Sequence, residues 1–178
     1  LVNKILKDLI QKSLLKNLKK SINKILIAHS SNDLYGASKI LLNIIELFIF
    51  EGYEIHLFLP SNGLLNDNPL IKKCKLNIIK PGVFRKKYFN FFGLINRLYF
   101  NIKSCILIRK YLLKNKIDLV YLNTSTIISP AIVARLINVA TIHHLHEIPS
   151  SSKIYTKFLV NFLKIFSNKV IAVSNSVK

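Results

Sequence analysis

The 178-residue sequence has no methionine, only two cysteines and only eight acidic residues. Since an ordinary initiator residue is missing, we expect the chain to be part of a longer reading frame. Cys74 and Cys105 stand alone, which disfavours a disulfide framework or a zinc site and is typical of a reducing compartment. The scarcity of carboxylates disfavours hydrolases that work with a pair of them.

The sequence also lacks a long apolar run and a targeting segment. The best candidate for a membrane span, 40–50, is short and is interrupted by Asn43 and Glu46. No compact apolar block followed by small residues opens the chain, so no secretory signal is predicted. We therefore expect a cytoplasmic protein, at most peripheral at the inner face of the plasma membrane.

What the sequence has in excess is positive charge. Lysine and arginine outnumber aspartate and glutamate by 27 to 8, which gives a formal net charge of +19. A field of this sign favours anionic partners such as nucleic acid, phospholipid headgroups or phosphorylated substrates. An AT-rich coding sequence would give the same excess without selection for a partner, so the charge leaves both interpretations open.

Residues 1–22 predict a basic amphipathic helix. Apolar residues recur at helical spacing from Leu1 to Ile22, and six lysines lie between them. Such a helix suits an anionic membrane surface, although it would also pack on its own domain or form a disordered extension. We separate it from residues 23–178, which predict one domain.

From Lys24 onward, buried strands alternate with helices. Apolar runs closed by polar residues predict strands at 24–29, 54–59, 76–79, 119–123, 139–143 and 169–173. Helical patterns cover 37–50, 91–114, 129–137 and 153–166. This alternation requires right-handed crossovers and a parallel sheet with helices on both faces. The predicted fold class is therefore α/β, a Rossmann-like doubly wound domain.

Ligands of open parallel sheets bind beyond the carboxyl ends of the strands. The segments that follow the predicted strands are all polar or small, at 29–36, 60–63, 123–126, 144–147 and 174–176. Gly36 comes directly before a helix, whose free N–H groups and positive dipole end suit a phosphate. Neither a dinucleotide fingerprint nor a P-loop is present, so a plain turn glycine is a slightly better explanation from the residues alone.

Three histidines and a glutamate close another predicted strand, as His143-His-Leu-His-Glu147. Strand alternation sends His143 and His144 to opposite faces, which disfavours a shared metal ion. His146 and Glu147 are better placed to face a cleft, where histidine hydrogen-bonds sugar hydroxyls or exchanges a proton. A satisfied structural histidine is the alternative.

Four further patterns occur in a set order. They are the loop step Tyr35-Gly-Ala-Ser38 with the strand Gly52-Tyr-Glu-Ile-His-Leu-Phe-Leu-Pro60, the strand Ile117-Asp-Leu-Val-Tyr-Leu-Asn123, the strand end Thr141–Glu147, and Lys169-Val-Ile-Ala-Val-Ser-Asn-Ser176. In this order they resemble glycosyltransferase family 4 enzymes of the GT-B fold. The resemblance implies the N-terminal, acceptor-side half of an enzyme that moves a sugar from a nucleotide-sugar to an acceptor, commonly with retention.

The resemblance also implies roles for individual residues. His146 would be the catalytic residue, in contact with the transferred sugar or the reaction centre. The donor diphosphate or sugar would lie against Gly36, Ala37 and Ser38. The acceptor side of the cleft would be lined by Asn123, Thr124, Glu147 and Ser174. The nucleotide-sugar is a substrate, and neither a cofactor nor a tightly bound metal is implied.

The family's second domain, with its nucleotide pocket and paired glutamates, is not found in this sequence. We therefore expect the C-terminal donor domain to be absent and the chain alone to have no measurable transferase activity. The acceptor we expect is a cell-envelope polysaccharide or a lipid-linked glycan. The basic and aromatic patch Arg85–Phe92 would help to hold the enzyme at the membrane.

Two other functions stay open. A basic Rossmann-like module would bind nucleic acid through phosphate contacts, with aromatic side chains stacked on single strands. The close spacing of Phe89, Phe91 and Phe92 favours helix core or membrane contact over such a stacking platform. A nucleotide-sugar epimerase of the GT-B fold is the other alternative, which the loop step at Gly36 disfavours without excluding.

Overall fold

The computed structural model describes residues 22–80, 91–146 and 153–172. Within these ranges, strands and helices alternate as predicted. In chain order the elements are β1 (Lys24–Ala28), α2 (Gly36–Phe50), β2 (Glu54–Leu59), the 3-10 helix η2 (Leu64–Asp67), α3 (Pro69–Lys72), β3 (Lys75–Ile78), α4 (Phe91–Asn115), β4 (Leu119–Leu122), α5 (Ser129–Leu136), β5 (Ala140–Leu145), α6 (Lys153–Phe166) and β6 (Lys169–Ala172).

The strands form one parallel sheet in the order β3-β2-β1-β4-β5-β6. The order reverses between β1 and β4, where Ala28 of β1 pairs with Leu122 of β4. This is the strand order of the doubly wound dinucleotide-binding folds. The α/β, Rossmann-like parallel sheet predicted from the sequence is confirmed.

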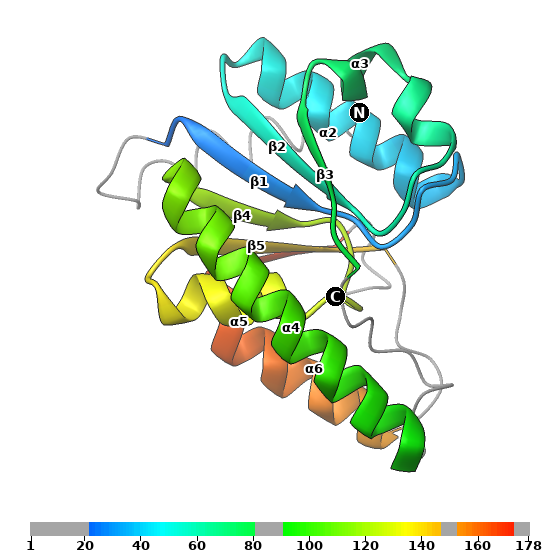
Figure 1. Cartoon of the computed structure of the whole chain (residues 1–178), viewed down its shortest axis with the longest axis vertical. Helices are drawn as coiled ribbons and strands as arrows, with labels where there is room; N and C mark the ends of the chain where they lie inside the picture. Colours follow the sequence, from blue (N-terminus) through cyan, green and yellow to red (C-terminus); the bar gives the residue numbers. More distant parts are fainter. Residues whose placement is uncertain (1–21, 81–90, 147–152, 173–178) are drawn as a thin grey trace.

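Helices cover both faces of the sheet, with α2 and α3 on one side and α4, α5 and α6 on the other (Figure 1). Alternate residues of β1 supply the two cores: Ile25 and Ile27 pack with α2, whereas Leu26 and Ala28 pack with α4 and α5. Because both faces are covered, the two central strands are apolar on both sides, over residues 25–28 of β1 and 119–122 of β4. No helix in the described part of the chain combines the length and apolar character needed to span a bilayer.

The loops that follow β1 and β2, at the carboxyl ends of the strands, are joined by hydrogen bonds. Asn32, after β1, donates from Nδ2 to the carbonyl oxygen of Ser61 at 2.8 Å and accepts at Oδ1 from the Leu65 N–H at 2.8 Å. Gly63 lies against this asparagine, since a Cβ at Gly63 would be 2.5 Å from the Asn32 carbonyl oxygen. A glycine is therefore required at 63 by a close approach of two backbones.

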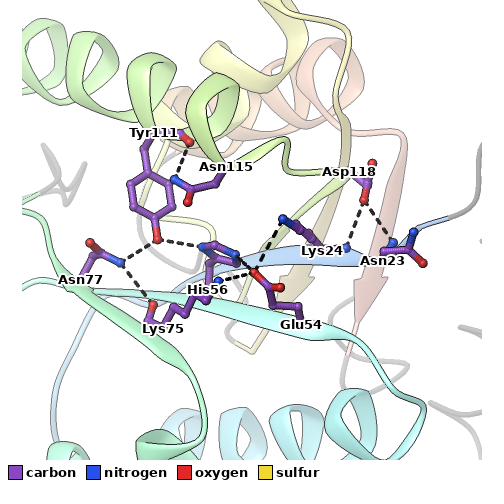
Figure 2. Close-up of polar contacts among 9 residues, drawn as sticks. All are labelled: Asn23, Lys24, Glu54, His56, Lys75, Asn77, Tyr111, Asn115 and Asp118. Carbon is purple, nitrogen blue, oxygen red and sulfur yellow. Dashed lines mark hydrogen bonds and ion pairs between the residues drawn. The ribbon is translucent and has the colours of Figure 1, made fainter.

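The amino edge of the sheet carries a separate polar network (Figure 2). The carboxylate of Glu54 accepts from His56 Nε2 and from Lys75 Nζ, each at 2.7 Å. These hydrogen bonds lower the pKa of the Glu54 carboxyl to about 2, and the one from Lys75 has the larger effect. Tyr111 of α4 completes the network, with its hydroxyl 2.7 Å from His56 Nδ1 and 2.8 Å from Asn77 Nδ2.

The structure differs from the predicted elements in two places. Between the predicted strands 54–59 and 76–79, where no helix was predicted, the chain forms η2 and α3. Asn68 caps α3 with its side chain, Pro69 occupies the first turn, and Leu65 and Ile71 are buried. Strand β5 continues two residues past the predicted end, since residues 143–145 pair with β6. The predicted helix 1–22 and patch Arg85–Phe92 lie almost wholly outside the described residues.

Candidate functional site

The candidate site is formed where β1, β4 and β5 end. His29 follows β1, Asn123 follows β4 and His146 follows β5. The three residues share a strand face with Ile27, Tyr121 and His144, and this is the face covered by α2. The site therefore lies at the reversal of the strand order, where ligands of open α/β sheets bind.

Asn123 is the centre of the site. Its side chain is fully buried, and its Nδ2 donates to the carbonyl oxygen of Ala37, in the first turn of α2, at 3.0 Å. The same nitrogen lies 3.2 Å from His29 Nδ1. On its other side, Asn123 Oδ1 lies 2.7 Å from His146 Nε2. One side chain thus joins three strand ends to the start of a helix.

The network continues from His29 into the loop before α2. His29 Nε2 lies 3.1 Å from Ser38 Oγ and 3.2 Å from Ser31 Oγ. Ser38 Oγ donates to Asp33 Oδ1 at 2.8 Å. Burial favours a raised pKa for Asp33, but the hydrogen bonds from Ser38 and Tyr35 outweigh it and lower the pKa. Because the Ser38 hydroxyl is fully buried and directed to Asp33, the group is no serine nucleophile.

The start of α2 is open on its outer side. The Tyr35 carbonyl accepts from the N–H groups of Ser38 and Lys39, at 2.9 and 3.0 Å, and no side chain caps the helix at Tyr35. The N–H groups of Gly36 and Ala37 make no hydrogen bond to any described residue. Gly36 is exposed, and a Cβ there would meet no atom of the described residues within 4 Å. This helix end can accommodate an anion.

His146 and its neighbour His144 are uncharged at neutral pH. Burial, with smaller contributions from neighbouring histidines, lowers the pKa of His146 to about 4 and that of His144 to about 3. The two rings lie 4.4 Å apart, and His144 Nδ1 lies 2.6 Å from the Tyr121 hydroxyl. Nδ1 of His146 is buried and has no hydrogen-bond partner among the described residues.

His143 lies on the opposite face, as strand alternation predicts. Its Nδ1 lies 2.7 Å from Ser167 Oγ, and its ring packs edge-on against Phe162 of α6. Burial lowers its pKa to about 3. His143 is therefore part of the core under α6. Across the residues that the structure describes, no three His, Cys, Asp or Glu side chains are placed to hold a metal ion together.

The structure thus brings together four of the residues that the sequence predicts for the site. His146, Asn123, Ala37 and Ser38 belong to one network or its backbone anchor, and Gly36 is adjacent. The side chains of Asn123 and Ser38 are buried in that network, whereas we expected them to contact ligand.

Of the remaining predicted site residues, the structure describes only Thr124. Thr124 is half-buried, and its hydroxyl oxygen lies 2.9 Å from that of Thr126. Glu147 and Ser174 lie outside the described residues.

The sequence analysis placed His29 and Asp33 in the polar segment 29–36 but named neither of them as a site residue. His29 carried a signal, because it closes β1 in the same way as Asn123 closes β4. Asp33 carried none, since its contact with Ser38 depends on the conformation of the loop.

Comparison with known families decides which class of protein carries this site. The sequence model described as Glycosyltransferase Family 4 matches residues 35–178. The chain belongs to glycosyltransferase family 4. The match includes the first turn of α2, Asn123 and His146. The resemblance seen in the four sequence patterns is thereby confirmed.

Two solved structures show the same fold as this family 4 domain. MurG from Acinetobacter baumannii matches with a TM-score of 0.62 and 13% identity, over 88% of this chain and 43% of that one. The apo form of the lipopolysaccharide outer core galactosyltransferase WaaB matches with a TM-score of 0.58 and 12% identity, over 88% of this chain and 40% of that one. The chain spans less than half of either enzyme and corresponds to the N-terminal half of the GT-B fold. No curated protein matches the sequence.

Proposed function

We propose that this domain serves a glycosyltransferase that moves a sugar, with retention, from a nucleotide-sugar to a cell-envelope polysaccharide or a lipid-linked acceptor. The observation that carries the proposal is the link through Asn123 between the first turn of α2 and His146. An anion-binding helix end and an uncharged histidine are thereby held side by side at the strand-order reversal. Membership of family 4 supplies the reaction class.

In this proposal the start of α2 binds the donor diphosphate. The N–H groups of Gly36 and Ala37, which have no partner among the described residues, donate to its oxygens. The positive end of the helix dipole adds to the attraction. The small side chains at 36 and 37 let the diphosphate approach the backbone. Asp33 works against this attraction, because the hydrogen bonds from Ser38 and Tyr35 lower its pKa and keep its carboxylate negatively charged.

His146 is the proposed catalytic residue, in contact with the transferred sugar or the reaction centre. Since its pKa of about 4 keeps it neutral, it acts as a hydrogen-bonding group and not as a fixed positive charge. Thr124, Glu147 and Ser174 are proposed to line the acceptor side. We propose no cofactor and no metal beyond the nucleotide-sugar substrate, and a second domain would close the cleft from the other side.

The donor site can be tested with two substitutions at one position. Gly36→Pro removes one of the two N–H groups, in a geometry that proline favours: it would be the first helical residue, and Tyr35 before it is extended. Gly36→Ala keeps the N–H and adds a methyl group where nothing lies within 4 Å. The probes are inorganic pyrophosphate and a panel of nucleotide-sugars, followed by amide chemical shifts.

We expect the wild-type chain and Gly36→Ala to bind pyrophosphate with similar affinity and Gly36→Pro to bind about tenfold more weakly, as the loss of one charge-assisted hydrogen bond predicts. Equal binding by both variants, or no shift at residues 36 and 37, would exclude the proposed donor site. In a complete enzyme, the anomeric configuration of the product, read by NMR, tests retention.

We propose in addition that the enzyme is peripheral to an anionic membrane. On the outer face of α4, the apolar side chains of Ile95, Tyr99, Ile102 and Ile106 are exposed at spacings of three and four residues. Exposed basic side chains flank them, and α4 contains no acidic residue. An apolar stripe with a basic border suits a surface of anionic lipid better than it suits stacked nucleotide bases.

A further inference from the structure

One atom, the carbonyl oxygen of Ala37, determines which atoms of the site's hydrogen-bond network donate and which accept. The carbonyl oxygen of Ala37 only accepts, so the atom of Asn123 that lies 3.0 Å from it is the amide nitrogen. The amide oxygen of Asn123 therefore faces His146. Since an oxygen of this kind only accepts, His146 Nε2, at 2.7 Å, carries the proton of the pair.

The donors and acceptors between Asn123, His29 and Asp33 can be assigned in the same way. The second N–H of the Asn123 amide points to His29 Nδ1 at 3.2 Å, which makes that nitrogen an acceptor. A neutral His29 then carries its proton on Nε2, 3.1 Å from Ser38 Oγ. The Ser38 hydroxyl in turn donates to the carboxylate of Asp33. Ser31 Oγ, 3.2 Å from the same nitrogen, is a second hydroxyl oxygen that can accept the His29 proton. The assignment is therefore self-consistent from His146 to Asp33.

We infer that Asn123 is a positioning residue that holds His146 in the Nε2–H tautomer and leaves Nδ1 as a bare hydrogen-bond acceptor. The inference deepens the proposed function and rests on it for the identity of the ligand. Nδ1 is buried and has no partner among the described residues, so a ligand that donates a hydrogen bond would satisfy it. A sugar hydroxyl is such a donor, whereas an ionised phosphate oxygen is not.

The charge of His146 agrees with this assignment. Burial holds its pKa at about 4, so at neutral pH the ring has one N–H, and that N–H is committed to Asn123. The two parts of the site therefore bind different groups of the ligand. The N–H groups at residues 36 and 37 bind its anionic oxygens, and His146 Nδ1 accepts a hydrogen bond from one of its hydroxyl groups.

The experiment is NMR of the whole chain with ¹⁵N-labelled histidine, in the absence of any nucleotide-sugar. Long-range ¹H–¹⁵N correlations identify each ring nitrogen as protonated or bare. We expect His146 to be protonated at Nε2 in the wild-type chain. Asn123→Ala should turn it into a mixture of both tautomers, because the acceptor is lost.

Two further variants separate positioning from general damage. Ser38→Ala deletes a hydroxyl of the same network, but the Ala37 carbonyl still orients Asn123, so His146 should stay protonated at Nε2. Asn123→Asp keeps an acceptor toward His146 and loses the donor toward both His29 and the Ala37 carbonyl. His146 should therefore keep its proton on Nε2, whereas His29 should move its proton to Nδ1.

His56 serves as the internal control for folding. It belongs to the separate network with Glu54 and Tyr111 at the amino edge of the sheet (Figure 2), and its signals should be the same in all four chains. A wild-type His146 protonated at Nδ1 would overturn the inference, whatever the variants do. An unchanged His146 tautomer in Asn123→Ala, with His56 intact, would do so as well. Because no sugar donor is present, either result would leave the proposed reaction untouched.

Discussion

At the scale of single residues, burial of histidine makes stability depend on pH. His143 is fully buried, and its pKa is about 3, against 6.5 for an exposed histidine. In the window between these values the unfolded chain binds a proton that the folded chain does not. The free energy of unfolding therefore falls as the pH falls below 6.5, by about 1.4 kcal/mol per pH unit for each such histidine.

Replacing His143 by glutamine should remove one such contribution. We expect the slope of unfolding free energy against pH, measured with urea between pH 4.5 and 6.5, to drop by about 1.4 kcal/mol per unit in this variant. His56→Gln is the matched control: burial also lowers the pKa of His56, but the hydrogen bond that its ring donates to Glu54 opposes that shift, so the slope should change less. An unaltered slope in His143→Gln would show that His143 is protonated in the folded chain.

Strand alternation predicted the opposite directions of His143 and His144, because a single strand fixes them. It could not predict that His29, Asn123 and His146 meet, since that depends on the order in which strands pair. The carboxyl ends of the strands were predicted as the site, but the burial of Asn123 and Ser38 was not. Burial of a polar side chain depends on partners from other strands, such as His29 for both.

At the scale of elements, the contact between the loops after β1 and β2 gives a prediction. Gly63 has an extended φ of 175°, so its backbone suits any residue, and the constraint is the Asn32 carbonyl oxygen, 2.5 Å from the position that a Cβ would take. Gly63→Ala should lower the free energy of unfolding by about 1–3 kcal/mol. Gly36→Ala adds the same methyl group in open space and should change it by less than about 0.5 kcal/mol.

Chemical denaturation of the two alanine variants measures this difference directly. If Gly63→Ala were as stable as Gly36→Ala, the two loops would not be held against each other in solution.

Helix α4 is the element on which membrane binding depends. We expect the chain to sediment with vesicles that contain anionic lipid at low salt, and Ile102→Glu to reduce the bound fraction severalfold, because a charge enters the apolar stripe. Leu136→Glu places the same charge at an exposed leucine of α5 and should bind as the wild type does. No sedimentation at low salt would remove the membrane proposal.

Most elements were predictable because their apolar patterns are long. The bounds of α4 and α6 differ from prediction by at most one residue at either end. The short helices η2 and α3 were missed, since four-residue elements have no periodicity to detect and depend on the cap at Asn68. The two added residues of β5 depend on pairing with β6, a tertiary effect.

At the scale of the whole molecule, the proposed function makes this domain one wall of a cleft. The chain covers 43% of the length of MurG and 40% of that of WaaB. We therefore expect the purified chain to bind donor fragments weakly and to show no turnover of any nucleotide-sugar in a coupled nucleotide-release assay. Turnover by this chain alone would contradict the expectation and would place the complete catalytic machinery in this domain.

The strand-order reversal also governs when the site can form during synthesis. His29 and Asn123 are 94 residues apart in sequence, although they touch across β1 and β4. A ribosome that adds roughly 5–20 residues per second needs about 5 to 20 seconds to synthesise the residues between them. During this interval β1 and β2 can pair, but the other edge of β1 has no hydrogen-bonding partner until β4 has been synthesised. A nascent chain released within that interval would expose an unpaired strand edge and a half-built site, so this domain should depend on chaperones more than its size suggests.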